Sequence, residues 1–132
     1  MRGIQYTYRV HLPITVLLAD DSDAIRSSIV RILRTDFRIT IVGQAVNFSH
    51  TLQMCANLRP TVVLLELHMP DEREFAPALV KSRLLLSAKH VLAMSIRADQ
   101  KSDKLAARYG ATTLLDKTNL AFELVPVILR LR

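Results

Sequence analysis

The most informative segment of the chain is PTVVLLELHMP, residues 60–70. Residues 62–65 are all apolar and begin with two β-branched side chains, and a proline stands at each end of the segment. This pattern predicts a central strand that is buried on both faces of a parallel sheet. Glu66 would stand where the strand leaves the sheet, the edge at which open α/β sheets bind ligands. Either Glu66 belongs to a site there, or it is an ordinary exposed glutamate.

Length and composition indicate one α/β domain. A chain of 132 residues has the size of a single domain with a real core, and a hydrophobic content of 50% excludes a disordered chain. Cys55 is the only cysteine and no signal-peptide pattern is present, so we expect a cytoplasmic protein without an internal disulfide. No apolar run approaches the roughly 20 residues of a membrane span.

The chain is basic, with a formal net charge of +6. Such a balance suggests nucleic acid or an acidic partner. The Lys and Arg residues are scattered, however, and no basic block with interleaved aromatic residues occurs. We interpret the charge mainly as solvated helix faces and keep a basic nucleic-acid-binding module as the alternative function.

Five apolar runs alternate with five helical patterns. The strands are expected at residues 14–19, 39–46, 62–65, 90–94 and 112–115. Helices are expected from Ser22 or Asp23, from Asn47 or Ser49, over 75–87, over 99–109, and from Thr118 or Asn119.

Right-handed crossovers between these elements give a doubly wound parallel sheet with helices on both faces. Gly43 predicts a bulge or a close approach in the second strand, and Pro126 should kink the last helix or shift its start. We expect residues 1–12 to form an N-terminal extension and residues 13–132 to form the domain.

Polar side chains follow four of the predicted strands: Asp20 and Asp21, Glu66, Ser95, and Lys117. All of these residues lie at the same edge of a parallel sheet. Three carboxylates repel one another unless a cation joins them, and oxygen ligands suit Mg²⁺. A lysine and a hydroxyl at the rim could hold the oxygens of a phosphoryl group.

Residues 13–132 resemble the receiver domain of bacterial two-component response regulators. The matching motifs are LADD at 18–21, VLLELHMP at 63–70, MS at 94–95, GA at 110–111 and LLDK at 114–117. The resemblance implies a flavodoxin-like fold, with five helices around a five-stranded parallel sheet in the order 2-1-3-4-5.

The resemblance also implies roles for the residues at the sheet edge. The implied ligands of Mg²⁺ are Asp20, Asp21, Glu66 and the backbone carbonyl of His68. Ser95 would contact a phosphoryl oxygen, and Lys117 would pair with the acceptor carboxylate or with the phosphoryl group.

The chain departs from the family where phosphate is accepted, because Glu66 stands in place of the acceptor aspartate. Its extra methylene pushes the carboxylate into the volume of the phosphoryl group, and a misplacement of about 1 Å can cost around a hundredfold in rate. Ile96, Leu114 and Glu74 also replace a small, an aromatic and a glycine residue that are usual in the family. Glu66 then either mimics phosphate in an active-like domain or marks a fixed interaction module, and we favour the second because Leu114 removes part of the usual relay.

The resemblance places the domain among signalling proteins, not enzymes. A phosphatase of the aspartyl type needs a second aspartate where Ser22 stands, and His11, His50 and His90 lack the spacing of a zinc site. The expected partners are a histidine kinase or another signalling protein. With the chain ending at Arg132, DNA binding would fall to this domain itself.

A homodimer is also expected, through the face formed by the fourth helix, the fifth strand and the fifth helix. The basic residues predicted for this face are Arg97, Lys101, Lys104, Arg108 and Lys117.

Overall fold

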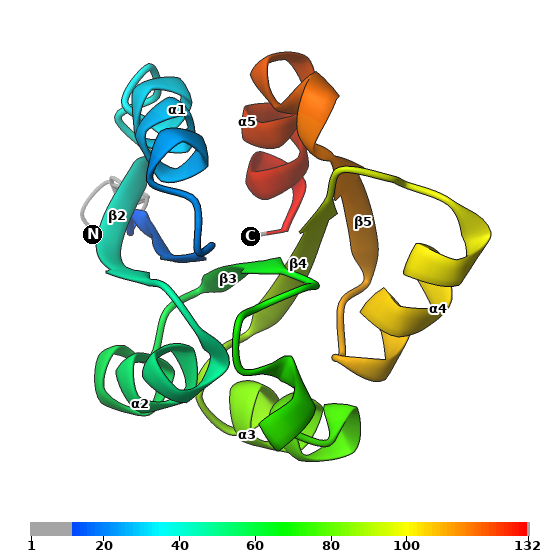
Figure 1. The fold of residues 1–132 in the computed structure, drawn as a ribbon. Helices are drawn as coiled ribbons and strands as arrows, with labels where there is room; N and C mark the ends of the chain where they lie inside the picture. The colour runs from blue at the N-terminus through cyan, green and yellow to red at the C-terminus, as the bar shows by residue number, and fades with distance from the viewer. Residues whose placement is uncertain (1–11, 132) are drawn as a thin grey trace, which may run out of the picture.

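The computed structural model describes residues 12–131 and contains five parallel strands in the order β2-β1-β3-β4-β5 (Figure 1). The predicted doubly wound sheet and its strand order are confirmed. The strands are β1 Ile14–Ala19, β2 Ile39–Ala45, β3 Val62–Glu66, β4 His90–Ser95 and β5 Thr113–Asp116. The N-terminal extension predicted for residues 1–12 lies, apart from Leu12, outside the described residues.

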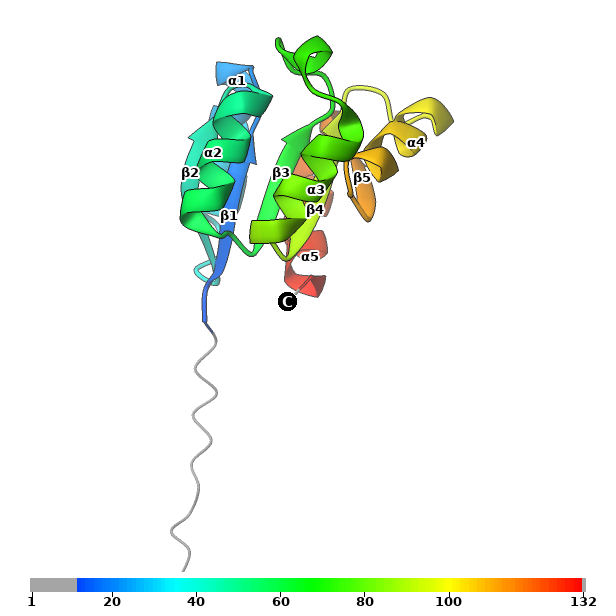
Figure 2. The same cartoon turned by 90° about the horizontal axis from the view of Figure 1, so that it is seen from below.

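Helices cover both faces of the sheet (Figures 1 and 2). The helices are α1 Asp23–Leu33, α2 Phe48–Leu58, α3 Pro77–Ser87, α4 Gln100–Arg108 and α5 Leu120–Arg130, with short 3₁₀ turns at Glu72–Glu74 and Lys117–Asn119. Helices α1 and α5 lie on one face and α2, α3 and α4 on the other. Within residues 12–131, none of these helices is both long enough and apolar enough to cross a bilayer.

Strand β3 is buried on both faces, as its apolar run predicts. Val63 and Leu65 belong to the core under α2, α3 and α4, while Val62 and Leu64 belong to the core under α1 and α5. Because successive side chains of a strand point to opposite faces, a strand between two helical layers must be apolar throughout. This strand carries Glu66 out of the middle of the sheet.

Gly43 combines the two features that its position suggests. The pairing of β1 with β2 shifts register between Val16 and Leu17, where Gly43 is the residue opposite Leu17. A Cβ at Gly43 would lie 2.5 Å from the terminal methyl carbon of Met54 in α2. A larger residue at this position would force the flexible Met54 side chain to move, so Gly43 allows the close approach of this helix.

Two prolines have different effects on the helices that contain them. Helix α3 begins at Pro77 and not at the predicted residue 75, since Phe75 ends the preceding 3₁₀ turn and a proline fits the first turn of a helix. Pro126 lies inside α5, whose first residue is Leu120. The proline therefore does not shift the start of α5, which lies next to Thr118 and Asn119 as the sequence predicts.

Replacement of Leu64 by alanine should destabilise the fold strongly. The side chain is fully buried in β3, and removing it leaves a cavity that typically costs about 2–5 kcal/mol. Urea unfolding followed by circular dichroism measures the loss. Leu86→Ala is the matched control, because Leu86 is 74% exposed and its truncation should change stability by less than about 0.5 kcal/mol. Equal losses in the two variants would contradict the two-layer core.

Candidate functional site

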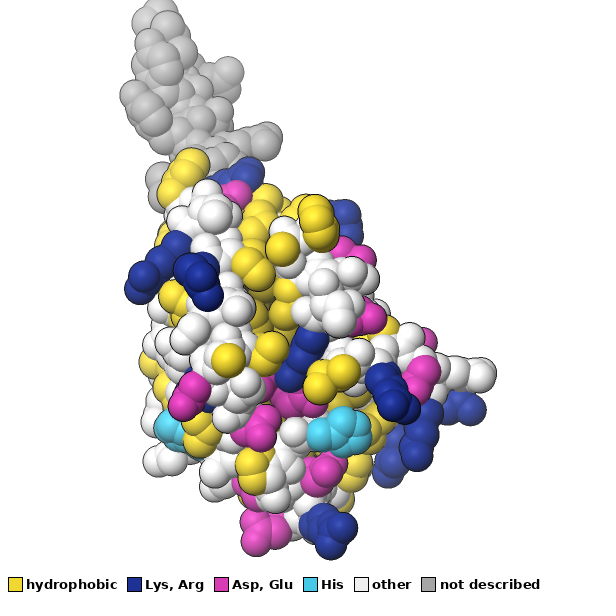
Figure 3. All heavy atoms as spheres, turned by 45° about the horizontal axis from the view of Figure 1, so that its top comes forward, with side chains coloured by type: hydrophobic (Ala, Val, Ile, Leu, Met, Phe, Trp, Pro, Cys, Tyr) yellow, Lys and Arg dark blue, Asp and Glu magenta, His cyan; other side chains and the backbone are white. Residues whose placement is uncertain are grey.

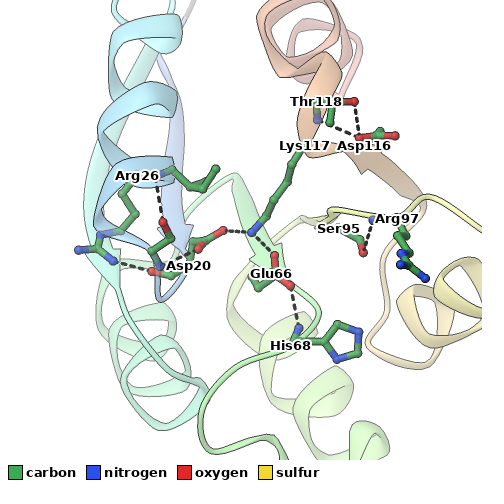
Figure 4. A network of polar contacts seen from close by, with 11 residues as sticks. Asp20, Arg26, Glu66, His68, Ser95, Arg97, Asp116, Lys117 and Thr118 are labelled. Carbon is green, nitrogen blue, oxygen red and sulfur yellow. Dashed lines mark hydrogen bonds and ion pairs between the residues drawn. The ribbon is translucent and has the colours of Figure 1, made fainter.

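Three ionic side chains meet at the carboxyl edge of the sheet (Figure 4). Asp20 follows β1, Glu66 ends β3, and Lys117 follows β5. The Lys117 ammonium lies 2.5 Å from Asp20 Oδ2 and also forms an ion pair with Glu66 Oε2. The side chains of Asp20, Glu66 and Lys117 are only 0%, 7% and 8% exposed. Sequence reasoning brought these three residues to one edge, and the structure places them in direct contact.

Lys117 neutralises part of a buried negative charge. The two carboxylate oxygens that face it have no other polar partner within residues 12–131. Burial alone lowers the pKa of Lys117, but the hydrogen bonds that Lys117 donates to Asp20 and Glu66, together with the negative charges of these carboxylates, outweigh burial, so the pKa lies above its usual value. Lys117 is thus held in its charged form.

The remaining carboxylate oxygens are bound by backbone amides of their own loops. Asp20 Oδ1 accepts a hydrogen bond of 2.9 Å from the Ser22 amide, and Glu66 Oε1 accepts one of 3.0 Å from the His68 amide. Both oxygens of each carboxylate are therefore engaged. The directions of the two side chains are fixed by the backbone as well as by Lys117.

Arg26 supports the site from behind, and the sequence analysis did not single it out. Its guanidinium donates a 2.7 Å hydrogen bond to the Asp20 carbonyl and a 3.2 Å hydrogen bond to Gln44 in β2, and it pairs with Asp23. The side chain is 13% exposed. The feature of the sequence that could have indicated a role for Arg26 is its position in the first turn of a helix that follows two aspartates.

The loop after Glu66 is fastened to helix α2. Asp71 accepts hydrogen bonds of 2.8 Å and 3.0 Å from the amides of Phe48 and Ser49. Asn47 accepts a hydrogen bond of 2.7 Å from the next amide, that of His50. The first amides of α2 are therefore satisfied partly by a residue far along the chain.

The predicted magnesium ligands do not form a cluster in this arrangement. Asp21 is exposed, and the His68 ring is 58% exposed and lies 3.2 Å from Glu72. No group of three or more His, Cys, Asp or Glu side chains suited to a metal ion is found in the described part of the chain. Lys117 takes the place between Asp20 and Glu66, so these donors do not fit Mg²⁺ unless the lysine moves. Magnesium binding stays a prediction.

Ser95, and two of the residues that differ from the family pattern, lie around this network. Ser95 is buried, and its hydroxyl accepts a 3.2 Å hydrogen bond from the Arg97 amide. Ile96 is 72% exposed at the rim, while Leu114 is half-buried against the core. The Ser95 hydroxyl is thus engaged by its own loop.

A cleft of about 960 Å³ opens from this network toward α4. Acidic side chains gather near its mouth and Lys and Arg side chains on the α4 side (Figure 3). Arg97, Lys101, Lys104 and Arg108 line the cleft. The prediction that Lys117 belongs to the outward basic face is wrong, because this side chain is drawn inward by two carboxylates.

Solved structures with the same fold are receiver domains of response regulators. The receiver domain of the putative response regulator NarL from Mycobacterium tuberculosis has a TM-score of 0.77 and 24% identity, covering 89% of this chain and 94% of that one. The response regulator domain of Thermotoga maritima CheB has a TM-score of 0.75 and 21% identity, covering 89% and 95% of the two chains. The chain therefore has the receiver-domain fold.

A curated relative matches most of the chain but only part of its own length. The protein-glutamate methylesterase/protein-glutamine glutaminase 3 of Myxococcus xanthus is 30% identical over 114 residues, which are 84% of this chain and 32% of that protein. The chain spans about a third of the length of the first curated relatives that it matches. No protein-family model matches the chain.

Replacement of Lys117 by methionine should destabilise the protein because it leaves two buried carboxylates without a counter-charge. Removing one partner of a buried ion pair costs on the order of 3–5 kcal/mol. The double variant Glu66→Gln/Lys117→Met should lose at least about 1 kcal/mol less than Lys117→Met alone, since contacting residues are not additive. Chemical unfolding of the two variants measures both losses, with the exposed Lys89→Met as control. A double variant that loses as much stability as Lys117→Met alone would contradict the network.

The stabilisation by Lys117 should depend on pH. Because its pKa is raised in the folded state, its contribution is complete below the ordinary value of 10.5 and is lost as the pH rises above it. The difference in unfolding free energy between wild type and Lys117→Met should therefore narrow above pH 10.5. Urea titrations from neutral to alkaline pH check this, and a constant difference would contradict the assignment of charge.

Proposed function

We propose that this chain is an atypical receiver domain of two-component phosphorelay signal transduction, acting through protein–protein contacts, in which Glu66 impairs phosphorylation. The observation that carries the proposal is the state of the Glu66 carboxylate at the end of β3. One of its oxygens pairs with Lys117 and the other accepts the His68 amide. The receiver-domain fold of the neighbouring structures supports the same class of function.

Glu66 is poorly suited to attack a phosphoryl donor. An acceptor oxygen has to be free and in line with the bond that breaks, and both oxygens of Glu66 are held within the protein. Near-attack geometry is sensitive to displacements of about 1 Å, and the glutamate is one methylene longer than the aspartate it replaces.

Of the two interpretations of Glu66, the fixed interaction module is favoured. A phosphate mimic would direct its charge to Ser95 as well as to Lys117. Glu66 does reach Lys117, but the Ser95 hydroxyl accepts from the Arg97 amide. Leu114 offers no aromatic ring to rotate in response.

The partners that this proposal implies are a histidine kinase or another signalling protein in the cytoplasm. A homodimer through α4, β5 and α5 belongs to the same proposal. Phe122 in α5 is 83% exposed and offers apolar area there.

Incubation with acetyl phosphate and Mg²⁺ tests the acceptor directly. Intact-mass spectrometry should detect no phosphoryl group on the wild type, because Glu66 has no free oxygen in position. Glu66→Asp shortens the side chain to the family's acceptor, and Glu66→Gln serves as the control that cannot accept phosphate.

The outcomes separate the interpretations of the site. No label on wild type or on Glu66→Asp supports a fixed module with a degenerate pocket. Label on Glu66→Asp alone identifies Glu66 as the only block and favours the phosphate mimic. Label on the wild type that Glu66→Gln abolishes would refute impaired phosphorylation.

A further inference from the structure

The wall of the cleft formed by α4 carries three cations that form no salt bridge within residues 12–131. Lys101, Lys104 and Arg108 recur at spacings of three and four residues, so they share one side of the helix. Together with Arg97 they line the cleft. None of the four forms a salt bridge with a carboxylate of residues 12–131. Asp99 also lines the cleft, and its carboxylate accepts a 2.8 Å hydrogen bond from the Ser102 amide. Hydrogen bonds with Ser102 and, to a smaller extent, the charge of Arg97 lower the pKa of Asp99, so Arg97 is partly balanced by this carboxylate.

Apolar side chains line the same cleft as these cations and the buried network. Ile25 of α1, Ile96 of the β4–α4 loop and Leu105 of α4 all line the cleft. Ile96 is 72% exposed although it is large and apolar. A cleft with an apolar surface and a few charged groups on one side is typical of sites for small organic ligands.

The acidic end of the cleft sets the orientation of a ligand. Lys117 offsets only one of the two charges of Asp20 and Glu66, and the exposed Asp21 adds another. Anionic groups are therefore repelled from the sheet edge and attracted to α4. An amine or amide donor on the ligand would match Asp21.

We infer that the cleft between the Lys117 network and α4 binds a small organic anion, either a phosphate ester or a polycarboxylate, with an apolar or aromatic body. The anionic group would lie on Lys101, Lys104 and Arg108, and the body on Ile96 and Leu105. The volume of about 960 Å³ lies within the range of ligand sites. This inference depends on α4 and is independent of whether Glu66 accepts phosphate.

A small molecule fits the cleft better than a macromolecule. The cleft has a volume of about 960 Å³, which is the size of a site for a small ligand. Asp20, Glu66 and Lys117 line it with side chains that are almost fully buried. Three of the four cations, Lys101, Lys104 and Arg108, lie along one short helix, Gln100–Arg108.

Titration of the full chain with four probes, followed by amide NMR at constant ionic strength, tests the inference. The probes are adenosine monophosphate, phthalate, inorganic phosphate and a polyglutamate peptide. We expect saturable shifts at Ile96 and Leu105 with adenosine monophosphate or phthalate. Inorganic phosphate lacks apolar surface and should bind at least about tenfold more weakly.

Two variants and one control connect the binding to this cleft. Lys104→Gln should weaken the binding of the organic probes about fivefold, because a charge-assisted hydrogen bond is lost. Ile96→Ser should weaken the binding of the organic probes and leave the binding of inorganic phosphate unchanged. Ile96 and Lys104 are both exposed, so neither is needed for folding. Arg83→Gln on α3 removes an exposed cation elsewhere and should have no effect.

Binding of adenosine monophosphate alone supports a phosphate-ester ligand, and binding of phthalate alone supports a carboxylate ligand. The inference is overturned if neither binds, if inorganic phosphate binds as tightly as both, or if Arg83→Gln weakens binding as much as Lys104→Gln. Shifts in α4 caused by polyglutamate but by neither organic probe would overturn it in favour of an acidic protein partner.

Discussion

The carboxyl edge of the sheet depends on one constraint, the burial of a lysine between two carboxylates. Ions withdrawn from water must be paired and hydrogen-bonded, because their desolvation is costly. Asp20 and Glu66 leave the neighbouring strands β1 and β3, while Lys117 follows β5 on the far side of β4. Its long side chain therefore spans the edge and joins the ends of three strands. The same pairing occupies the oxygens on which both metal binding and phosphate acceptance would depend.

Residues whose environment follows from local sequence were predicted well. The apolar run of β3 and the polar residues at strand ends follow from the burial of parallel strands, and Gly43 follows from the steric demand of a close approach. Arg26 and Asp71 could not be predicted in the same way, because each acts on backbone groups of a different segment. Lys117 illustrates the limit most clearly. A lysine after a strand fits both a site and an exposed face, and only the positions of Asp20 and Glu66 decide between them.

The two halves of the cleft suggest how such a domain could receive a signal. Its acidic half contains Asp20, Glu66 and Lys117, to which the resemblance to receiver domains gives roles in phosphate acceptance, and these three side chains are held in contacts with one another. Its basic half, on α4, has cations that lack partners in the described part of the chain. If phosphorylation does not control the domain, a ligand at α4 would supply another input, next to the surface proposed for protein contacts. The fold alone does not determine which input is used.

The hydrogen bonds from Asp71 to the start of α2 have a consequence for local unfolding. Asp71 belongs to the loop that follows Glu66, yet it supplies the acceptors for the amides of Phe48 and Ser49. When this loop opens, the first turn of α2 loses these acceptors and frays. Opening of the loop and fraying of the helix are thus a single cooperative event. The rate at which the Phe48 and Ser49 amides exchange their hydrogens with solvent therefore reports the opening of the loop that follows β3.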